Sequence, residues 1–237
     1  MSEDTDSMPK RQFIRAAVGF IAYLLLSPVI LFLCAGTVRW PMGWVYVLLS
    51  LAAVVVSRLI VRKKNPDTLR ERARFTTAEG IKPWDRILST FVGILGPLLM
   101  VIVAGLDHRF DWPPAIPAWG QILAAVVTAG GYAVAAWAMV ANRYFSAVAR
   151  IQQDREQQVV SGGPYRFVRH PAYASAVLTA LTVPVMLDAL WALVPALAME
   201  VALVIRTRLE DRMLRQELAG YEGYAARTRY RLIPGVW

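Results

Sequence analysis

Long apolar runs recur along the chain and are separated by short or strongly basic segments. A membrane-spanning helix needs about 20 mostly apolar residues, and four of the runs have that length. A fifth run, residues 172–205, is too long for one crossing and carries only Asp188 and Glu200 as charges, so it predicts two helices that turn near residues 184–188. The pattern predicts an all-α integral membrane protein with about six spans, the last two forming a tight hairpin, over residues 13–37, 40–61, 87–106, 119–141, 172–187 and 189–205.

The composition agrees with this class, because 57% of the residues are hydrophobic. The first run is longer than the apolar core of a signal peptide and no small-residue cleavage site follows it, so we interpret it as a helix that forms a hairpin with the second span. We expect a flexible tail over residues 1–12 and one membrane domain over residues 13–237.

The net charge is +9, and its distribution favours a membrane protein over a nucleic-acid-binding protein. Under the six-span arrangement, 24 of the 26 lysines and arginines fall on one side, and only Arg39 and Arg109 fall on the other. Basic loops are typical of the cytoplasmic side. We therefore expect both termini and both long loops to be cytoplasmic, in the cytoplasmic membrane if the source is bacterial, with anionic lipids as partners.

Cysteine and histidine are scarce, which limits the chemistry available. Cys34 is the one cysteine, and His108 and His170 are the two histidines. A disulfide within the chain is therefore excluded, and the usual zinc ligands are too few for a metal site.

The loops carry their own local signals. Asn65-Pro66-Asp67 predicts a helix start capped by Asp67, followed by a short surface helix. The segment over residues 146–160 has a loose alternation that leaves a hairpin and an extended segment both open. Apolar residues recur at helical spacing after residue 206, and Gly220 predicts the end of that helix.

A polar and aromatic stretch, "GGPYRFVRHPAYAS", stands directly before the long apolar run. Its two glycines permit close approach of the backbone to a ligand. His170 precedes Pro171 and is therefore biased away from helix, while Pro171 suits the first turn of the next span. Tyr165 and Tyr173 add flat aromatic surface, so this stretch is a candidate site for a planar base and an anionic group.

A second polar cluster follows the hairpin. Arg206 and Glu210 are four residues apart and share a helix face. Because a hairpin crosses the membrane twice, both of its ends lie at the same surface. The topology therefore predicts that the stretch around His170 and the cluster after Arg206 form one pocket.

Three quoted segments carry a resemblance to a known family: "GPYRFVRHPAY" before the hairpin, "RLEDRML" after it, and "YEGYAARTRYRLIP" near the C-terminus. Together they resemble the isoprenylcysteine carboxyl methyltransferase family, within a wider group of integral-membrane phospholipid methyltransferases. "NPDTLRER" and "KPWDR" are similar to the preceding loop of prokaryotic members. In this chain Glu210-Asp211 stands where the family often has two glutamates.

The resemblance implies S-adenosylmethionine as the methyl donor, bound by residues 142–237, and a lipophilic or prenylated acceptor. Glu210 would pair with the cofactor's ammonium, and Arg169 or a backbone donor with its carboxylate. The resemblance implies a cofactor site made of Gly163, Tyr165, Arg169, His170, Pro171, Tyr173 and Glu210. It also implies Arg206, Glu210 and Arg229 as residues near the reacting group.

Other interpretations stay open beside this one. Arginines at helix ends also anchor spans, and Tyr221, Tyr224 and Tyr230 are also typical interfacial anchors. Glu200, an acid at membrane depth, is a secondary site candidate. A transporter or a non-catalytic scaffold is the alternative class. Among acceptors, an isoprenylcysteine-like carboxylate, a phospholipid amine and a small thiol all fit the motif, because the motif concerns the cofactor site.

Overall fold

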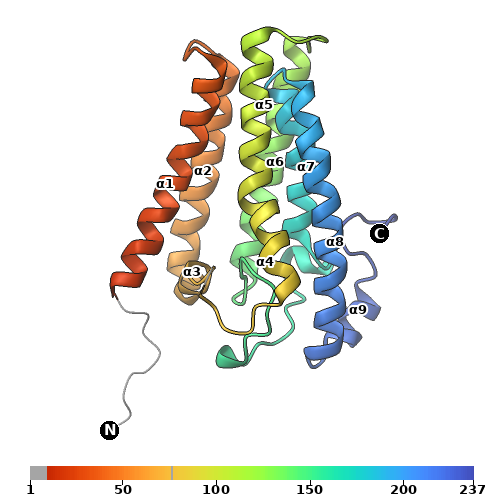
Figure 1. Cartoon of the computed structure of the whole chain (residues 1–237). Helices are drawn as coiled ribbons and strands as arrows, with labels where there is room; N and C mark the ends of the chain where they lie inside the picture. The colour runs from red at the N-terminus through yellow and green to blue at the C-terminus, as the bar shows by residue number, and fades with distance from the viewer. Residues whose placement is uncertain (1–9, 76) are drawn as a thin grey trace.

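The computed structural model describes residues 10–75 and 77–237, and all regular structure in those residues is helical (Figure 1). This confirms the all-α prediction. Residues 1–9 of the predicted flexible tail lie outside the described residues. The other three residues of that prediction, 10–12, belong to the first helix. The elements are α1 (Lys10–Ala35), α2 (Pro41–Lys64), α3 (Pro66–Ala73), α4 (Pro83–Thr90), the π-helix η1 (Phe91–Leu95), α5 (Gly96–Phe110), α6 (Ala118–Ala141), η2 (Gln153–Arg155), η3 (Gly163–Arg166), α7 (Pro171–Met186), η4 (Leu190–Ala192), α8 (Leu193–Glu217) and α9 (Tyr221–Arg227).

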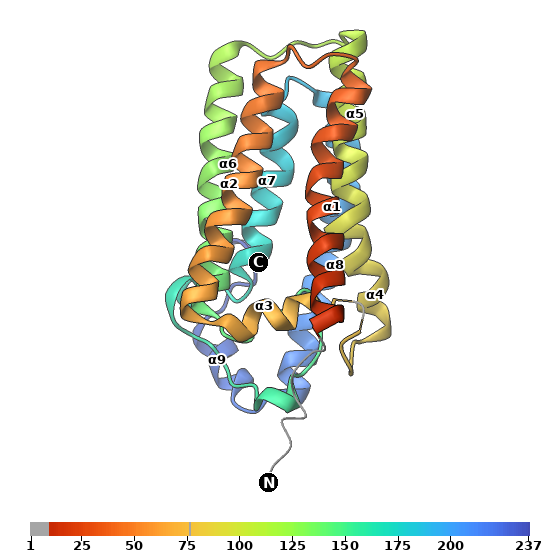
Figure 2. The same ribbon diagram turned by 90° about the vertical axis from the view of Figure 1, so that its left-hand side faces the viewer.

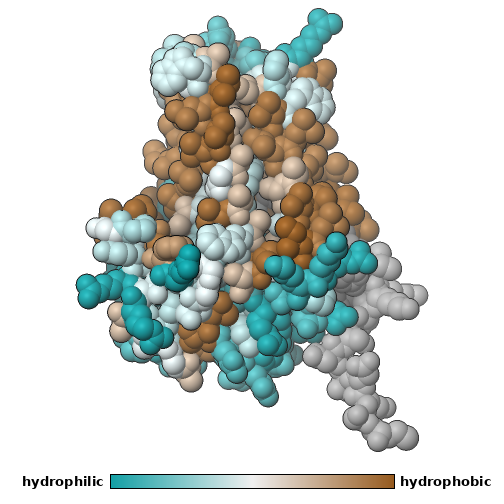
Figure 3. Space-filling model, turned by 180° about the vertical axis from the view of Figure 1, so that it is seen from behind, coloured by the Kyte–Doolittle hydropathy of each residue, from teal (hydrophilic) through white to brown (hydrophobic). Residues whose placement is uncertain are grey.

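Five helical segments are long and apolar enough to cross a membrane: Val18–Ala35, Pro41–Lys64, Pro83–Phe110, Ala118–Ala141 and Leu190–Glu217. The remaining predicted span, residues 172–187, corresponds to α7, which is apolar but has only 16 residues. At 1.5 Å per residue it is about 24 Å long, shorter than the roughly 30 Å hydrocarbon core. Figure 3 shows the apolar surface above a hydrophilic end. The chain is thus an integral membrane protein by its helices, and the orientation of its termini stays a prediction.

The hairpin made by α7 and α8 turns where the sequence predicts it. Pro184 lies in the last turn of α7, and the left-handed backbone of Asp188 (φ 56°) reverses the chain. The Asp188 carboxylate accepts a hydrogen bond from the backbone N–H of Ile116 at 2.5 Å, which ties the turn to the preceding loop. Both ends of the hairpin therefore reach the same end of the bundle.

The first two spans are joined by a short link, as the predicted hairpin requires, but they pack little against each other. Helix α1 packs chiefly against α5, and α2 against α6. Figure 2 shows α1, α5 and α8 on one side and α2, α6 and α7 on the other. Gly105 explains the α1–α5 pairing, because a Cβ there would lie 2.6 Å from the Leu31 carbonyl oxygen, so only glycine permits this approach.

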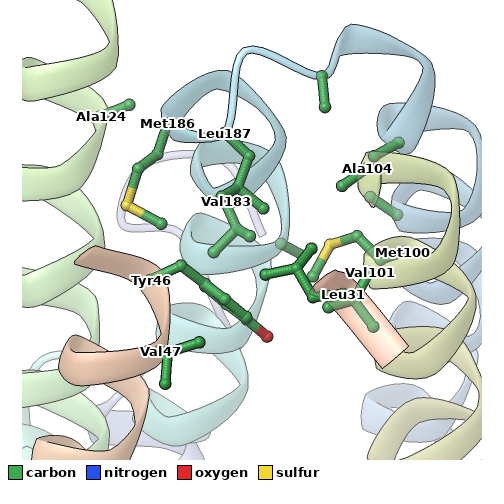
Figure 4. Packing of buried hydrophobic residues seen from close by; sticks show 14 of the residues in the cluster. Leu31, Tyr46, Val47, Met100, Val101, Ala104, Ala124, Val183, Met186 and Leu187 are labelled. Carbon is green, nitrogen blue, oxygen red and sulfur yellow. The ribbon is translucent and has the colours of Figure 1, made fainter. Parts of the chain in front are cut away.

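An apolar cluster joins the two sets of helices in the half of the bundle away from the polar end. Leu31, Met100, Tyr46 and Val183 come from four different helices and face a common centre (Figure 4). Leu31 is fully buried and Val183 is 2% exposed. Close packing of this kind holds the helices at a fixed spacing and so fixes where their polar ends meet.

The polar end is a cap built from residues 65–85, 142–170 and 206–237, which we call the polar cap. Here α3 lies across the ends of the helices, between α2 and α1 (Figure 2). The segment that left a hairpin and an extended form open is irregular in the structure, with the single turn η2. Gly220, with φ 80°, separates α8 from α9, a helix that the sequence analysis did not predict.

Candidate functional site

A pocket with an empty volume of about 800 Å³, including its open mouth, lies in the polar cap. The irregular segment after α6, the start of α7, the end of α8 and α9 form its walls. Six of the residues predicted for the cofactor line it: Tyr165, Arg169, His170, Pro171, Tyr173 and Glu210. The structure therefore brings together the two segments that hairpin topology predicts to be neighbours.

His170 begins α7 in the conformation that its neighbour Pro171 favours. It is the N-cap residue, with Pro171 at the first helical position. Its backbone N–H donates to the Arg231 carbonyl at 2.9 Å, so the C-terminal tail holds this turn in place. The imidazole is 7% exposed and lies parallel to the Tyr173 ring, with 5.6 Å between the ring centroids. Its Nε2 is buried without a hydrogen-bond partner in the described residues and lies 3.6 Å from Asp211 Oδ1.

Asp211 is a buried acid whose two oxygens are fully occupied. Arg169 donates to both of them, at 2.7 and 3.1 Å. Tyr221 donates to Oδ1 at 3.1 Å, Arg231 to Oδ2 at 2.9 Å, and Arg215 to Oδ2 at 3.4 Å. Asp211 therefore ties the start of α7, α8, α9 and the tail together, and no lone pair is left for a ligand.

Arg169 has little capacity left for a cofactor. Besides its two bonds to Asp211, its Nη1 donates to the carbonyls of Thr228 and Arg229, both at 2.7 Å. The guanidinium is 2% exposed. These contacts give Arg169 a structural role in the pocket wall, and its predicted bond to a cofactor carboxylate stays a prediction.

Glu210, next to Asp211, differs from it because only one of its two carboxylate oxygens is hydrogen-bonded in the described residues. Its Oε2 accepts a hydrogen bond from the Tyr173 hydroxyl at 2.5 Å, and its side chain faces the pocket. Within the part of the chain that the structure describes, its Oε1 makes no hydrogen bond. Of the two adjacent acids, Glu210 is therefore the one that can accept a bond from a ligand.

Arg206 lies behind the pocket wall. It donates to both oxygens of Asp85, at 2.6 and 3.2 Å, and to the carbonyl of Ala147 at 2.9 Å. Its guanidinium carbon is 5.1 Å from the centroid of the Tyr173 ring. Tyr173 thus has Glu210 on its hydroxyl and Arg206 over its face. Whether Arg206 also contacts an acceptor stays a prediction.

The two remaining predicted residues do not line this pocket. The Arg229 side chain is exposed, and its carbonyl is what contacts Arg169. Gly163 has φ 60°, and a Cβ there would lie 3.0 Å from the Ala141 side chain, so this glycine allows the turn to pack against α6. Their functional roles are likewise still predictions.

Tyr221 and Tyr224 contribute to the site in a way that the sequence analysis missed. They are 4% and 2% exposed and line the pocket, so the interpretation of these two as interfacial anchors is wrong. The Tyr224 hydroxyl donates to the Tyr165 carbonyl at 2.6 Å. Burial raises the pKa of Tyr224 to about 12, so the phenol stays protonated and keeps donating. The signal was their spacing of three on one helix face, in a helix too short to be predicted.

A third buried ion pair, between Arg150 and Glu71, holds the segment after α6 that lines the pocket. Arg150 donates to both oxygens of Glu71, at 2.9 and 2.8 Å, and also to Asp154. The bonds to Glu71 raise the pKa of Arg150 despite its burial. Because Glu71 belongs to α3 and Arg150 to the segment after α6, the pair fixes that segment against the helix ends.

Thr68 of α3 and Asn65, the residue before that helix, also bind the end of α6 and the segment that follows it. The Thr68 hydroxyl donates to the Arg143 carbonyl at 2.9 Å, and the Asn65 amide to the Val140 carbonyl at 3.1 Å. Asn65, not Asp67, is the N-cap residue of α3, and it makes no side-chain capping bond. Asp67 instead pairs with Arg70 at the surface, so its predicted capping role is wrong.

Residues 122–216 match the family model described as the isoprenylcysteine carboxyl methyltransferase (ICMT) family. No curated protein matches the chain. The matched range contains the stretch from Gly163 to Tyr173 and continues past Glu210, but it ends before Arg229 and begins after α3. The resemblance that the motifs predict is therefore confirmed over these residues.

Proposed function

We propose that this chain is an integral-membrane methyltransferase that binds S-adenosylmethionine in the polar cap and methylates a lipophilic acceptor, with an isoprenylcysteine-like carboxylate as the leading candidate. The polar cap would face the cytoplasm. The observation that carries the proposal is the unpartnered Oε1 of Glu210, which faces a pocket inside the matched range.

The residues of the pocket fit this cofactor. Glu210 offers a carboxylate oxygen to the ammonium group. The buried rings of Tyr165 and Tyr221 provide flat surface for the adenine, and the His170 Nε2 is a buried polar atom without a hydrogen-bond partner in the described residues.

S-adenosylmethionine supplies a methyl group activated by a positive sulfonium. The contribution of the protein is then chiefly alignment, because holding two reactants in line removes much of the barrier. Tyr173 is held between Glu210, His170 and Arg206 and so presents a rigid wall at the junction of pocket and bundle. Arg206 provides a cation close to this wall.

The acceptor decides whether a base is needed. A carboxylate is already a nucleophile and requires only a cation that places it. An amine must first lose a proton, and the Nε2 of His170 or the free oxygen of Glu210 would take it. Of these two groups, the Nε2 of His170 is buried, 3.6 Å from Asp211 Oδ1.

The first test is equilibrium binding of S-adenosylmethionine to the detergent-purified protein. We expect Glu210→Gln to weaken binding about 10- to 100-fold, because a bond to a charged group is worth about 1.5–3 kcal/mol. His170→Ala should also weaken it. Glu222→Gln is the matched control, since the Glu222 side chain is 69% exposed and outside the pocket wall. A folded wild type that never binds S-adenosylmethionine would refute the proposal.

The acceptor is identified by the chemistry of the product. Labelled S-adenosylmethionine would be offered with a farnesylated cysteine, with phosphatidylethanolamine or with a small thiol. A carboxyl methyl ester releases labelled methanol in base, whereas an N-methyl or S-methyl product does not. Base-labile label on the farnesylated cysteine is the expected result, and stable label on one of the others would replace it as the acceptor.

A further inference from the structure

Arg72, in the last turn of α3, is a half-buried cation without a carboxylate partner. Its guanidinium carbon lies 5.3 Å from the centroid of the Phe145 ring, and no described residue forms a salt bridge or hydrogen bond with its side chain. The buried arginines around it are different. Arg150 is paired with Glu71, Arg169 with Asp211 and Arg206 with Asp85.

Other cations surround Arg72 and make its charge less favourable. Burial and the like charge of Arg206 both lower the pKa of Arg72. Arg58, near the end of α2, also interacts with the charge of Arg72. Its guanidinium carbon lies 3.8 Å from the centroid of the Phe20 ring and its Nη1 donates to the Val54 carbonyl at 3.4 Å, with no carboxylate partner among the described residues.

Arg206 also has donors to spare on this side. Its Nε and Nη2 bond to Asp85 and Ala147, while its Nη1 makes no hydrogen bond in the part of the chain that the structure describes. Arg58 from α2 and Arg206 from α8 thus each interact with the charge of Arg72 in α3, and of the three only Arg206 has a carboxylate partner among the described residues, Asp85. A half-buried cation without a counter-charge is unfavourable, and an anion would relieve it.

The position of Arg72 links this excess charge to both the pocket and the membrane. Phe145 and Tyr173 line the pocket, and Arg72, which is not among the lining residues, interacts with both. Figure 2 shows α3 crossing the polar end of the bundle between α2 and α1. A lipophilic molecule whose apolar tail lies in the bilayer beside these helices would have its polar head group at the level of α3.

We infer that Arg72, together with Arg58 and the Nη1 of Arg206, binds the anionic group of the lipophilic acceptor, a carboxylate or a phosphate. This inference rests on the proposed methyltransferase function and names the charge that its acceptor carries. A guanidinium suits both anions, because its parallel N–H groups match two oxygens at once. Arg72 lies outside residues 122–216, so the family match does not assign it a role.

The test uses single-chain probes in a neutral detergent. Laurate carries a carboxylate, dodecyl phosphate carries a phosphate, and methyl laurate has the same tail without a charge. We expect the wild type to bind at least one of the two anions about 10-fold or more tightly than the ester, and Arg72→Gln to lose this preference. Arg72→Lys should keep part of it, because the charge remains. Preference for laurate indicates a carboxylate that is itself methylated, and preference for dodecyl phosphate indicates a phospholipid acceptor.

Arg70→Gln is the matched control, because Arg70 lies on the same helix, is exposed and pairs with exposed Asp67. It should bind all three probes as the wild type does. Arg72→Gln should also bind S-adenosylmethionine with wild-type affinity, which shows that the fold and the cofactor pocket are intact. With a working acceptor, the same variant should raise the KM for the acceptor about 10-fold or more and leave the KM for S-adenosylmethionine unchanged.

Two results would overturn the inference in different ways. If the wild type binds S-adenosylmethionine but binds both anions no better than the ester, or if Arg72→Gln keeps the preference, the anion site is wrong and the methyltransferase proposal stands. If Arg72-dependent anion binding occurs without any binding of S-adenosylmethionine, the methyltransferase proposal fails, and with it the assignment of the anion to an acceptor.

Discussion

The membrane bundle and the polar cap are stabilised by different interactions. In the bundle, helices approach through small residues such as Gly105 and through the apolar cluster around Val183, with few polar contacts such as the 2.8 Å bond between Thr128 and Thr182. In the cap, irregular backbone is held by buried carboxylates, chiefly Asp211 and Glu71.

This difference explains how the polar cap can combine fixed walls with groups that are free to bind a ligand. Most of its buried charges are paired and hydrogen-bonded, which fixes the walls. Against that background, the free oxygen of Glu210 and the unpaired guanidinium of Arg72 stand out. The bundle holds an acid of the same kind, because both carboxylate oxygens of Glu200, in α8, are buried without a hydrogen-bond partner among the described residues.

We expect the largest effect on stability when the buried carboxylate at the centre of the polar cap, Asp211, is replaced. Asp211→Asn leaves Arg169 buried beside a neutral amide, and removal of one partner from a buried pair costs about 3–5 kcal/mol. We expect a large loss of thermal stability, rapid proteolysis of the cap and no binding of S-adenosylmethionine. Asp67→Asn, at an exposed acid, should change stability by less than about 1 kcal/mol. A stable Asp211→Asn protein would show that the cap does not depend on its ion pairs.

A smaller effect is expected at the ion pair between Arg150 and Glu71. Glu71→Gln removes one carboxylate from Arg150, which keeps its bond to Asp154. Loss of charged hydrogen bonds should lower the free energy of unfolding by about 1.5–3 kcal/mol. Because the segment after α6 lines the pocket, affinity for S-adenosylmethionine should fall as well. Calorimetry and cofactor binding would be compared with Glu79→Gln, at an exposed acid of the same loop, and equal values for the two would contradict the role of Glu71.

The stability of the bundle should depend on side-chain volume, whereas the stability of the polar cap depends on the pairing of charges. Gly105→Ala places a methyl group 2.6 Å from the Leu31 carbonyl oxygen, and such overpacking costs about 1–3 kcal/mol. Thermal unfolding in detergent would measure this cost. Gly130→Ala is the control, since a Cβ there meets nothing within 4 Å. Equal stability of the two variants would mean that α1 and α5 are not packed as closely as described.

The smallest expected effect is at Tyr224. Removing its bond to the Tyr165 carbonyl by Tyr224→Phe should cost about 1 kcal/mol, with little effect in Tyr230→Phe, at an exposed tyrosine. The raised pKa of Tyr224 means that its contribution is fully present below the unfolded value near pH 10 and is lost as the pH rises through about 12. Unfolding followed against alkaline pH should show a smaller loss of stability in the Tyr224→Phe variant than in the wild type.

Much of this architecture is readable from one chain. The apolar runs predict the spans and the turn at Asp188 because the bilayer sets the length of a helix that crosses it. The hairpin predicts that the stretch around His170 and the residues after Arg206 are neighbours, because two crossings return the chain to the same surface. The motifs around Tyr173 and Glu210 predict the resemblance to the family, and the family model matches residues 122–216 around them.

Only the tertiary structure separates the adjacent acids and the arginines by role. Glu210 and Asp211 look equivalent in sequence, yet one faces the pocket and the other is enclosed by four partners. Arg150, Arg169 and Arg72 look alike as loop arginines, yet two are paired and one is not. Long-range partners such as Asp85 with Arg206 lie far apart along the chain, and sequence periodicity describes only neighbours on one helix. Pairing of buried charges depends on which side chains the folded helices bring together, so it is decided by packing and not by local pattern.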